Sequence, residues 1–198
     1  MALGVFVLPR DGVALTDLFA RNSSESDDDF MVRVLGGSSE LAQKVVRSTE
    51  LANGNVTLIG FAAAEDQSLV GHILIEIASG RYRHVQFPSC DEEGGWPTLL
   101  AVFFARTTKG GGRDLAVLCS WDVRHLEVDG TDYGAEFYRF KERDRKWSWS
   151  RIKDLNAKFE TADLVRVDVR GKVAGREKAK FKTVAEVKKM LTNMGLNQ

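Results

Sequence analysis

The densest group of residues able to do chemistry lies in the stretch SWDVRHLEVDGTDYGAEFYRF, residues 120–140. Asp122, His125 and Glu127 fall within six positions of one another there. Imidazole and carboxylate groups serve as metal ligands and as general acids or bases. A first hypothesis is therefore a hydrolase or metal-dependent enzyme that uses Asp122, His125 and Glu127.

The same stretch also has the pattern of a β-hairpin. Alternate apolar residues predict a strand with one buried face: Leu115, Val117, Cys119, Trp121 and Val123. The alternation changes phase before Leu126, which predicts a bulge at Arg124–His125, and Asp129–Gly130 predicts the tight turn. No HxH or HExxH spacing is present, so the hairpin interpretation is favoured, and neither a metal nor a cofactor is expected.

Known enzyme motifs give no further support for catalysis. His72 and His84 each lie inside an apolar strand pattern, and no serine lies in a GxSxG motif. In TTKGGGRD, residues 107–114, the lysine precedes the glycines and a strand follows, so the segment lacks the order of a phosphate loop. We interpret it as a hairpin connection.

The most unusual segment is GREKAKFK, residues 175–182. In an extended chain its four cations point the same way and form a basic ridge: Arg176, Lys178, Lys180 and Lys182. Residues 170–189 hold eight Lys or Arg against two Glu. Such a ridge either protects an edge strand from aggregation or is simply a solvated face, or it binds an acidic partner surface or a nucleic-acid backbone.

Two tryptophans, Trp147 and Trp149, occupy alternate positions between Lys146 and Arg151. Tryptophans of this kind either contact a partner, by stacking on bases or sugars or by anchoring a protein interface, or they fill the core. Both alternatives stay open from the sequence, with Trp147 and Trp149 kept as candidate partner-binding residues.

Composition limits the class of protein. A chain of 198 residues with 43% hydrophobic residues is long enough for a single domain, residues 1–198, to which the basic residues 170–198 add a candidate appendage. Lys plus Arg and Asp plus Glu number 28 each, and the resulting zero net charge argues against a nucleic-acid partner. The pattern predicts no membrane span, and the oligomeric state is left open.

The cysteines and the first residues bear on the compartment. Cys90 and Cys119 lie in no CxxC motif, and we expect two reduced, partly buried thiols rather than a disulfide scaffold. The segment MALGVFVLPRDG lacks the basic start of a signal peptide. A cytoplasmic protein is expected, or a periplasmic one if a signal peptide has been removed.

The elements predict an α+β fold made mainly of antiparallel strands, either a sandwich or a strongly curved sheet. Helices are expected at about 38–52 and at 183–194, where Thr183 and Glu186 form a capping box. Runs rich in Val, Ile and Phe predict the strands: 4–9, 30–36, 55–63, 68–80, 81–87, 98–107, 114–123, 135–141 and 163–171.

Because no catalytic constellation is evident and the charges are segregated, the function expected is a non-enzymatic protein-binding module. A bacterial inhibitor or immunity protein that neutralises a toxin or an enzyme would have these features.

Overall fold

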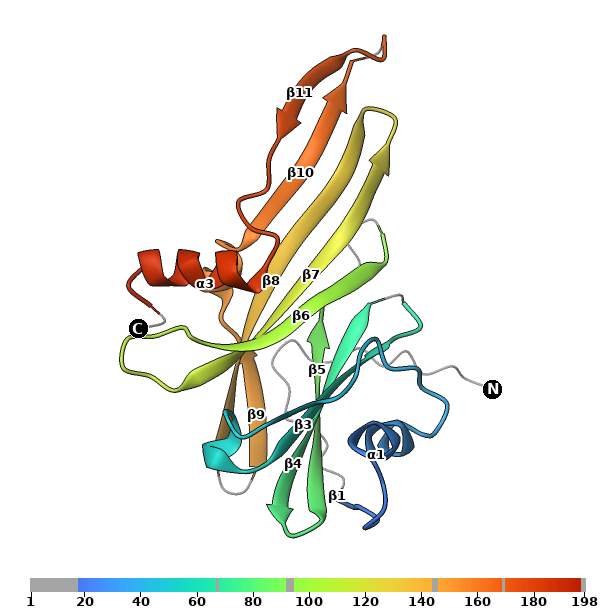
Figure 1. Ribbon diagram of the computed structural model, residues 1–198, viewed down its shortest axis with the longest axis vertical. Helices are drawn as coiled ribbons and strands as arrows, with labels where there is room; N and C mark the ends of the chain where they lie inside the picture. The colour runs from blue at the N-terminus through green and yellow to red at the C-terminus, as the bar shows by residue number, and fades with distance from the viewer. Residues whose placement is uncertain (1–17, 67, 92–94, 144–145, 169, 197–198) are drawn as a thin grey trace.

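The computed structural model describes residues 18–66, 68–91, 95–143, 146–168 and 170–196. It confirms the α+β class, because two antiparallel sheets dominate and three α-helices accompany them (Figure 1). The strand expected at 4–9 lies outside the described residues. Within the described residues, no helix is both long and apolar enough to cross a lipid bilayer.

The first sheet has five strands in the order β1-β5-β4-β3-β2. Its members are β1 (Leu18–Ala20), β2 (Val46–Ser48), β3 (Thr57–Ala63), β4 (Leu69–Ala78) and β5 (Arg81–Ser89). The three long strands are fully antiparallel neighbours, and both of their faces carry buried apolar residues. This sheet therefore lies in the interior of the molecule.

The second sheet has six strands, in the order β11-β10-β8-β7-β6, with β9 paired to β8. They are β6 (Pro97–Arg106), β7 (Arg113–His125), β8 (Val128–Arg143), β9 (Lys146–Arg151), β10 (Glu160–Val167) and β11 (Val173–Glu177). The long strand β8 has different neighbours at its two ends, because β10 pairs with its first half and β9 with its second half.

This division of β8 produces a projecting arm. We define the arm as β10, β11 and the part of the β7–β8 hairpin between Ser120 and Gly134. Figure 1 shows the arm extending away from the five-stranded sheet, at the end of the molecule opposite the β4–β5 turn. Its β11 edge pairs with no further strand among the described residues. Its two faces are partly covered, because Trp121, Ala162 and Leu164 are buried on one face and Lys182 lies over Tyr133 on the other.

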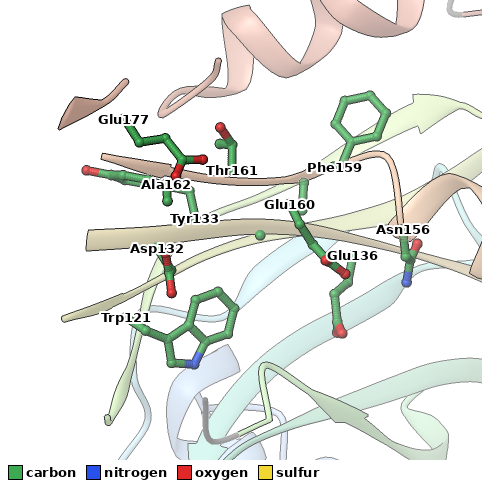
Figure 2. Close-up of a pocket in the computed structure, with 12 residues that line it drawn as sticks. Trp121, Asp132, Tyr133, Glu136, Asn156, Phe159, Glu160, Thr161, Ala162 and Glu177 are labelled. Carbon is green, nitrogen blue, oxygen red and sulfur yellow. The ribbon is translucent and has the colours of Figure 1, made fainter. Parts of the chain in front are cut away.

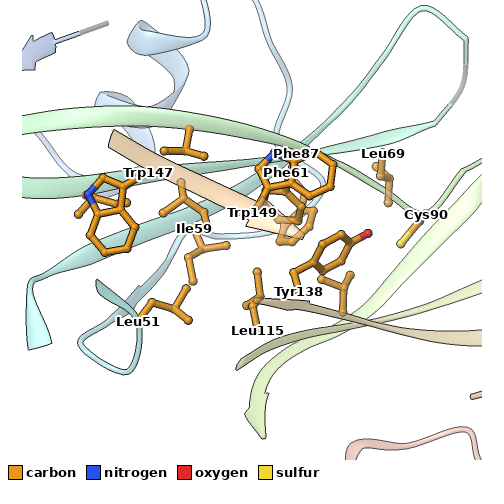
Figure 3. Close-up of a cluster of buried hydrophobic side chains, with 14 of the residues drawn as sticks. Leu51, Ile59, Phe61, Leu69, Phe87, Cys90, Leu115, Tyr138, Trp147 and Trp149 are labelled. Atoms are coloured by element: carbon orange, nitrogen blue, oxygen red, sulfur yellow. The ribbon is translucent and has the colours of Figure 1, made fainter. Parts of the chain in front are cut away.

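The main core lies between the two sheets. Phe87 from β5 packs against Tyr138 from β8 with ring centroids 4.8 Å apart, and Tyr138 packs against Trp149 at 6.2 Å (Figure 3). Trp147 and Trp149 from β9 are 2% and 6% exposed. The structure thus places both tryptophans in the core, the second of the two alternatives above, and their rings offer no surface to a partner.

Helices cover the outer faces of both sheets. Helix α1 (Asp27–Val34) buries Phe30 and Met31 against the first sheet. Helix α3 (Val184–Asn193) buries Val187 and Leu191 against the second, and the short α2 (Lys153–Asn156) packs beside it through Leu155. The predicted capping box at Thr183 and Glu186 is confirmed.

The first helix is not where the sequence analysis placed it. The helix expected at 38–52 is wrong, because this region contains strand β2 and a short 3-10 helix, η1 (Ala52–Gly54). The strand expected at 30–36 is also wrong, because these residues belong mainly to α1. The physical reason is the cap: the Ser26 side chain accepts the Asp29 N–H, and three aspartates occupy the positive first turn.

The hairpin in residues 120–140 also differs in detail. Its turn is Leu126–Glu127 rather than Asp129–Gly130, and the register between β7 and β8 runs from Leu115 to His125 without the expected bulge. Gly130 is needed inside the strand instead, because a Cβ there would overlap the backbone carbonyl of Asp163 on β10.

Candidate functional site

The residues of the enzymatic hypothesis do not form a site. Asp122 and His125 lie on opposite faces of β7, and Glu127 lies in the turn beyond it. The Asp122 side chain is 74% exposed and lies 3.9 Å from the guanidinium of Arg124. Among the described residues, no group of three potential ligands is placed to hold a metal ion.

The basic ridge is exposed but only partly regular. Arg176 lies in β11, whereas Lys178, Lys180 and Lys182 follow that strand in an irregular segment. Lys182 forms an ion pair with Asp163, and its ammonium lies 5.6 Å from the centre of the Tyr133 ring. Because Lys182 is already engaged, Arg176, Lys178 and Lys180 are the ridge cations that remain available for steering a partner.

A cavity of about 320 Å³ lies at the base of the arm (Figure 2). Four carboxylate residues contribute to its lining: Asp132, Glu136, Glu160 and Glu177. We call it the acidic cavity. Figure 2 shows Trp121, Asp132 and Glu136 on one side of the sheet, with Phe159 and Thr161 on the other.

Strand register explains why the carboxylates meet. Asp132 and Glu136 lie on the same face of β8, on either side of Gly134, because side chains alternate along a strand. Glu160 of β10 is directly opposite Gly134. Glu177 of β11 lies opposite Leu164, two residues beyond the β10 partner of Asp132. The absent side chain at Gly134 makes room for the Trp121 ring between them.

Trp121 forms the apolar wall of the acidic cavity. It is the β7 partner of Asp132, and its ring lies over Gly134, where an added Cβ would come within 3.1 Å of the indole. The indole N–H donates a hydrogen bond of 2.9 Å to the backbone carbonyl of Asp91. The ring therefore has a fixed orientation.

The charges in the acidic cavity are poorly compensated. Burial, and secondarily the negative charge of Glu177, raise the pKa of the Asp132 carboxyl above its usual value. Burial also raises the pKa of Glu136, and Arg151, whose Nη2 lies 3.5 Å from Glu136 Oε1, offsets only part of this effect. The Tyr138 hydroxyl donates to the same Glu136 carboxylate.

A disulfide joins the two sheets beside this cavity. Cys90, just after β5, is bonded to Cys119 of β7, with their Cα atoms 6.3 Å apart. The expectation of two reduced thiols is therefore wrong: the register of the two sheets brings these residues together although 29 positions separate them. The Cys90 backbone N–H also donates to Glu136, at 3.4 Å.

The acidic cavity was not recognised from the sequence. Its only local signal is the spacing of Asp132, Gly134 and Glu136, which an exposed strand face would share. Carboxylates beside an aromatic wall can hold a positively charged group, and the described lining contains no histidine, cysteine or serine that would suggest a nucleophile.

Comparison of the chain with protein-family models, with curated proteins and with solved structures finds no match. The functional argument therefore rests on the geometry and charges of this chain.

Proposed function

We propose that this chain is a non-enzymatic protein-binding module of the inhibitor type, with the arm as its binding element. The observation that carries the proposal is the projection of the arm beyond the five-stranded sheet, with β11 as an edge strand to which no further described strand is paired. Proteins commonly bind a partner by pairing a strand of the partner with an exposed sheet edge.

Apolar residues at the end of the arm support this proposal. Leu126 in the β7–β8 turn is 100% exposed, and Val173 in β11 is 55% exposed. A partner would remove this apolar surface from water, which is favourable by about 25 cal/mol for each Å² buried. Single exposed apolar residues are ordinary on protein surfaces, so the argument depends on their position on a projecting element.

Charge segregation on the arm adds specificity. The acidic cavity lies on the face that continues the inter-sheet core, whereas Arg176, Lys178 and Lys180 lie along and beyond the β11 edge. Separated charges of opposite sign orient an approaching partner and raise its rate of association. We propose that the basic ridge meets an acidic surface on a partner such as a bacterial toxin or enzyme, which an immunity protein or inhibitor would neutralise.

The disulfide suggests where this binding occurs. Disulfides persist in oxidising compartments and are rare in the cytosol. We therefore favour the periplasmic or another oxidising location over the cytoplasmic one, on the support of the Cys90–Cys119 bond.

Affinity capture from the native host, followed by association kinetics with the captured protein, tests the proposal. The ridge variant is Lys178→Glu/Lys180→Glu, which leaves the Lys182–Asp163 pair intact. The matched control is Lys141→Glu/Lys146→Glu, because these exposed lysines lie at the β8–β9 end, away from the arm.

We expect the ridge variant to associate severalfold more slowly than wild type at low salt, and the control to associate like wild type. The difference should shrink toward 1 M salt, where the screening length is about 3 Å. Equal rates for all three proteins at low salt would contradict the steering role of the ridge.

A further inference from the structure

We propose that two copies of this chain associate through strand β6, by pairing their β6 edges antiparallel about a twofold axis at Phe104. Among the described residues, β6 is paired only with β7, and it forms the edge of the second sheet opposite to β11 (Figure 1). The inference goes beyond the proposed function, because it concerns a different edge and a second copy of the chain rather than a foreign partner.

Strand β6 differs from the other edge strands of the two sheets. Strands β1 and β2 have three residues each, and β9 and β11 have six and five. Strand β9 carries Lys146 and Arg151 at its ends, and β11 carries Arg176 and Glu177. Strand β6 has ten residues, and its only charged one is Arg106 at the end. Because proteins usually keep edge strands short or charged, β6 lacks the common protection against pairing with another chain.

The register of the second sheet shows which backbone groups of β6 face away from β7. The Ala135 N–H of β8 donates to the segment just before β10, on the side away from β7. Leu118, opposite Ala135, therefore directs its backbone groups toward β6, and its partner Ala101 directs its own toward β7. Since this direction alternates along a strand, Val102 and Phe104 present their N–H and C=O groups outward.

The pairing uses the second part of β6. At the start of the strand, Pro97 has no N–H to offer. The register with β7 then shifts between Leu99 and Ala101, so Leu100 forms a bulge. From Ala101 to Arg106 the register is regular. This stretch has the length of an ordinary strand and provides the ladder for a second copy.

The side chains along this edge are incompletely covered. Trp96, just before β6, is 63% exposed, and Leu100 is 41% exposed. Val102 and Phe104 are partly exposed, although both pack against the main core. A second strand alongside β6 would remove part of this apolar surface from water, which favours association.

A second copy fits this edge because the regular stretch is compatible with itself. In an antiparallel pair centred on Phe104, each Phe104 lies opposite its counterpart, and Val102 lies opposite Arg106 of the second copy. A residue on the axis meets its own type, so a charge there would repel itself, whereas two aromatic rings attract. The two Arg106 residues are offset by four positions, about 13 Å, which exceeds the screening length of about 8 Å at physiological salt.

Sedimentation equilibrium over a series of concentrations tests the association. We expect the apparent mass to rise from 22.0 kDa toward twice that value as the concentration increases. Val102→Pro removes an outward N–H and keeps the hydrogen bonds to β7, and the twofold axis removes the same bond twice. Association should therefore be at least about tenfold weaker. Val102→Ala is the matched control, because it shortens the same side chain but keeps the N–H, and it should dimerise more tightly than Val102→Pro.

A second control uses the other edge of the sheet. Val173 of β11 lies opposite Val167, whose N–H donates to Glu127 on the side away from β11, so the Val173 N–H also points outward. Val173→Pro should therefore leave self-association unchanged.

An exchange of charge at residue 104 tests the position of the axis. Phe104→Lys should repel its own copy, and so should Phe104→Glu, so each variant alone should stay monomeric. An equimolar mixture of the two should associate, because the opposite charges face each other. Thermal melts establish that both variants are folded, and if either is not, the Val102 variants decide the outcome.

An apparent mass of 22.0 kDa at every concentration would overturn the inference. Dimers that Val102→Pro leaves intact, or that Val173→Pro abolishes, would also overturn it, because they assign the association to another surface. Folded Phe104→Lys and Phe104→Glu that fail to associate when mixed would contradict the axis at Phe104. None of these results depends on the association rate of the ridge variant, so the proposed function is judged separately.

Discussion

The indole N–H of Trp121 donates to the backbone carbonyl of Asp91 across a distance of 2.9 Å. The residues just before this pair, Cys119 and Cys90, form the disulfide. Two adjacent links therefore hold the segment after β5 against β7, one covalent and one a hydrogen bond. The acidic cavity has its apolar wall at this junction, so the connection between the sheets also positions the candidate site.

The disulfide gives a direct prediction. Protein purified without reductant and then denatured should show no titratable thiol, and Cys90→Ala/Cys119→Ala should lose about 2–5 kcal/mol of unfolding free energy. The loss is expected because the unfolded chain is no longer restrained by the cross-link. Thiol titration and urea melts measure the two effects, and two free thiols in the unreduced protein would contradict the bond.

Leu191 should contribute strongly to stability. Its side chain is fully buried between α3 and the second sheet, so Leu191→Ala should cost about 2–5 kcal/mol through lost burial and a residual cavity. Met194→Ala is the matched control, because Met194 lies past the same helix and is exposed. Similar melting temperatures for both variants would mean that α3 is not packed on the sheet.

His72 should make stability depend on pH. Burial, with a smaller contribution from the charge of His84, lowers the pKa of His72 from 6.5 to about 3. The imidazole therefore takes up a proton near pH 6.5 in the unfolded chain but stays neutral in the folded chain. The free energy of unfolding is highest above pH 6.5 and falls as pH drops toward 3. The full effect is on the order of 5 kcal/mol.

Chemical denaturation at several pH values between 7 and 4 measures this dependence, and His72→Gln should flatten it. His125→Gln is the control, because His125 is exposed near the end of the arm. A parallel fall in wild type and His72→Gln would assign the pH dependence to other groups. Replacing His125 should also leave the fold and partner binding nearly intact, whereas loss of a measurable activity with the fold retained would support the enzymatic hypothesis.

Glu136 should make stability depend on pH in the opposite direction from His72. Because burial raises its pKa above 4.5, the folded chain keeps a proton that the unfolded chain has already released. Stability thus falls as pH rises from about 4.5 through the raised pKa. Wild type should lose stability relative to Glu136→Gln over this range, and a constant difference between the two unfolding curves would show that Glu136 titrates normally.

Local patterns were sufficient for most of the fold. Strands such as β4 and β7 are runs of Val, Leu and Ile between turn residues, and α3 has both a capping box and an apolar stripe. Helix α1 was missed because three consecutive aspartates in its first turn are also typical of a solvated loop. The helix expected at 38–52 was wrong because the chain there forms the edge strand β2. In both segments, contacts with distant strands rather than the local pattern determine the secondary structure.

The candidate site could not be predicted to the same extent. Its carboxylates come from β8, β10 and β11, and they converge only because Glu160 is opposite Gly134 and Glu177 is opposite Leu164. No pattern within one strand specifies that register. The burial of Trp147 and Trp149 could not be predicted either. Their alternate positions indicate that they share one face of a strand, but not whether another layer covers that face.

Site-specific photocrosslinking in extracts of the native host tests the central claim most directly, namely that the arm is the binding element. A benzophenone side chain is placed at Leu126, in the turn at the end of the arm, or at Ile77, an exposed apolar residue near the β4–β5 turn at the opposite end. The account predicts a discrete adduct with one protein from position 126 and none from position 77. Adducts from position 77 alone, or from neither position while a partner is captured by the wild-type chain, would contradict it.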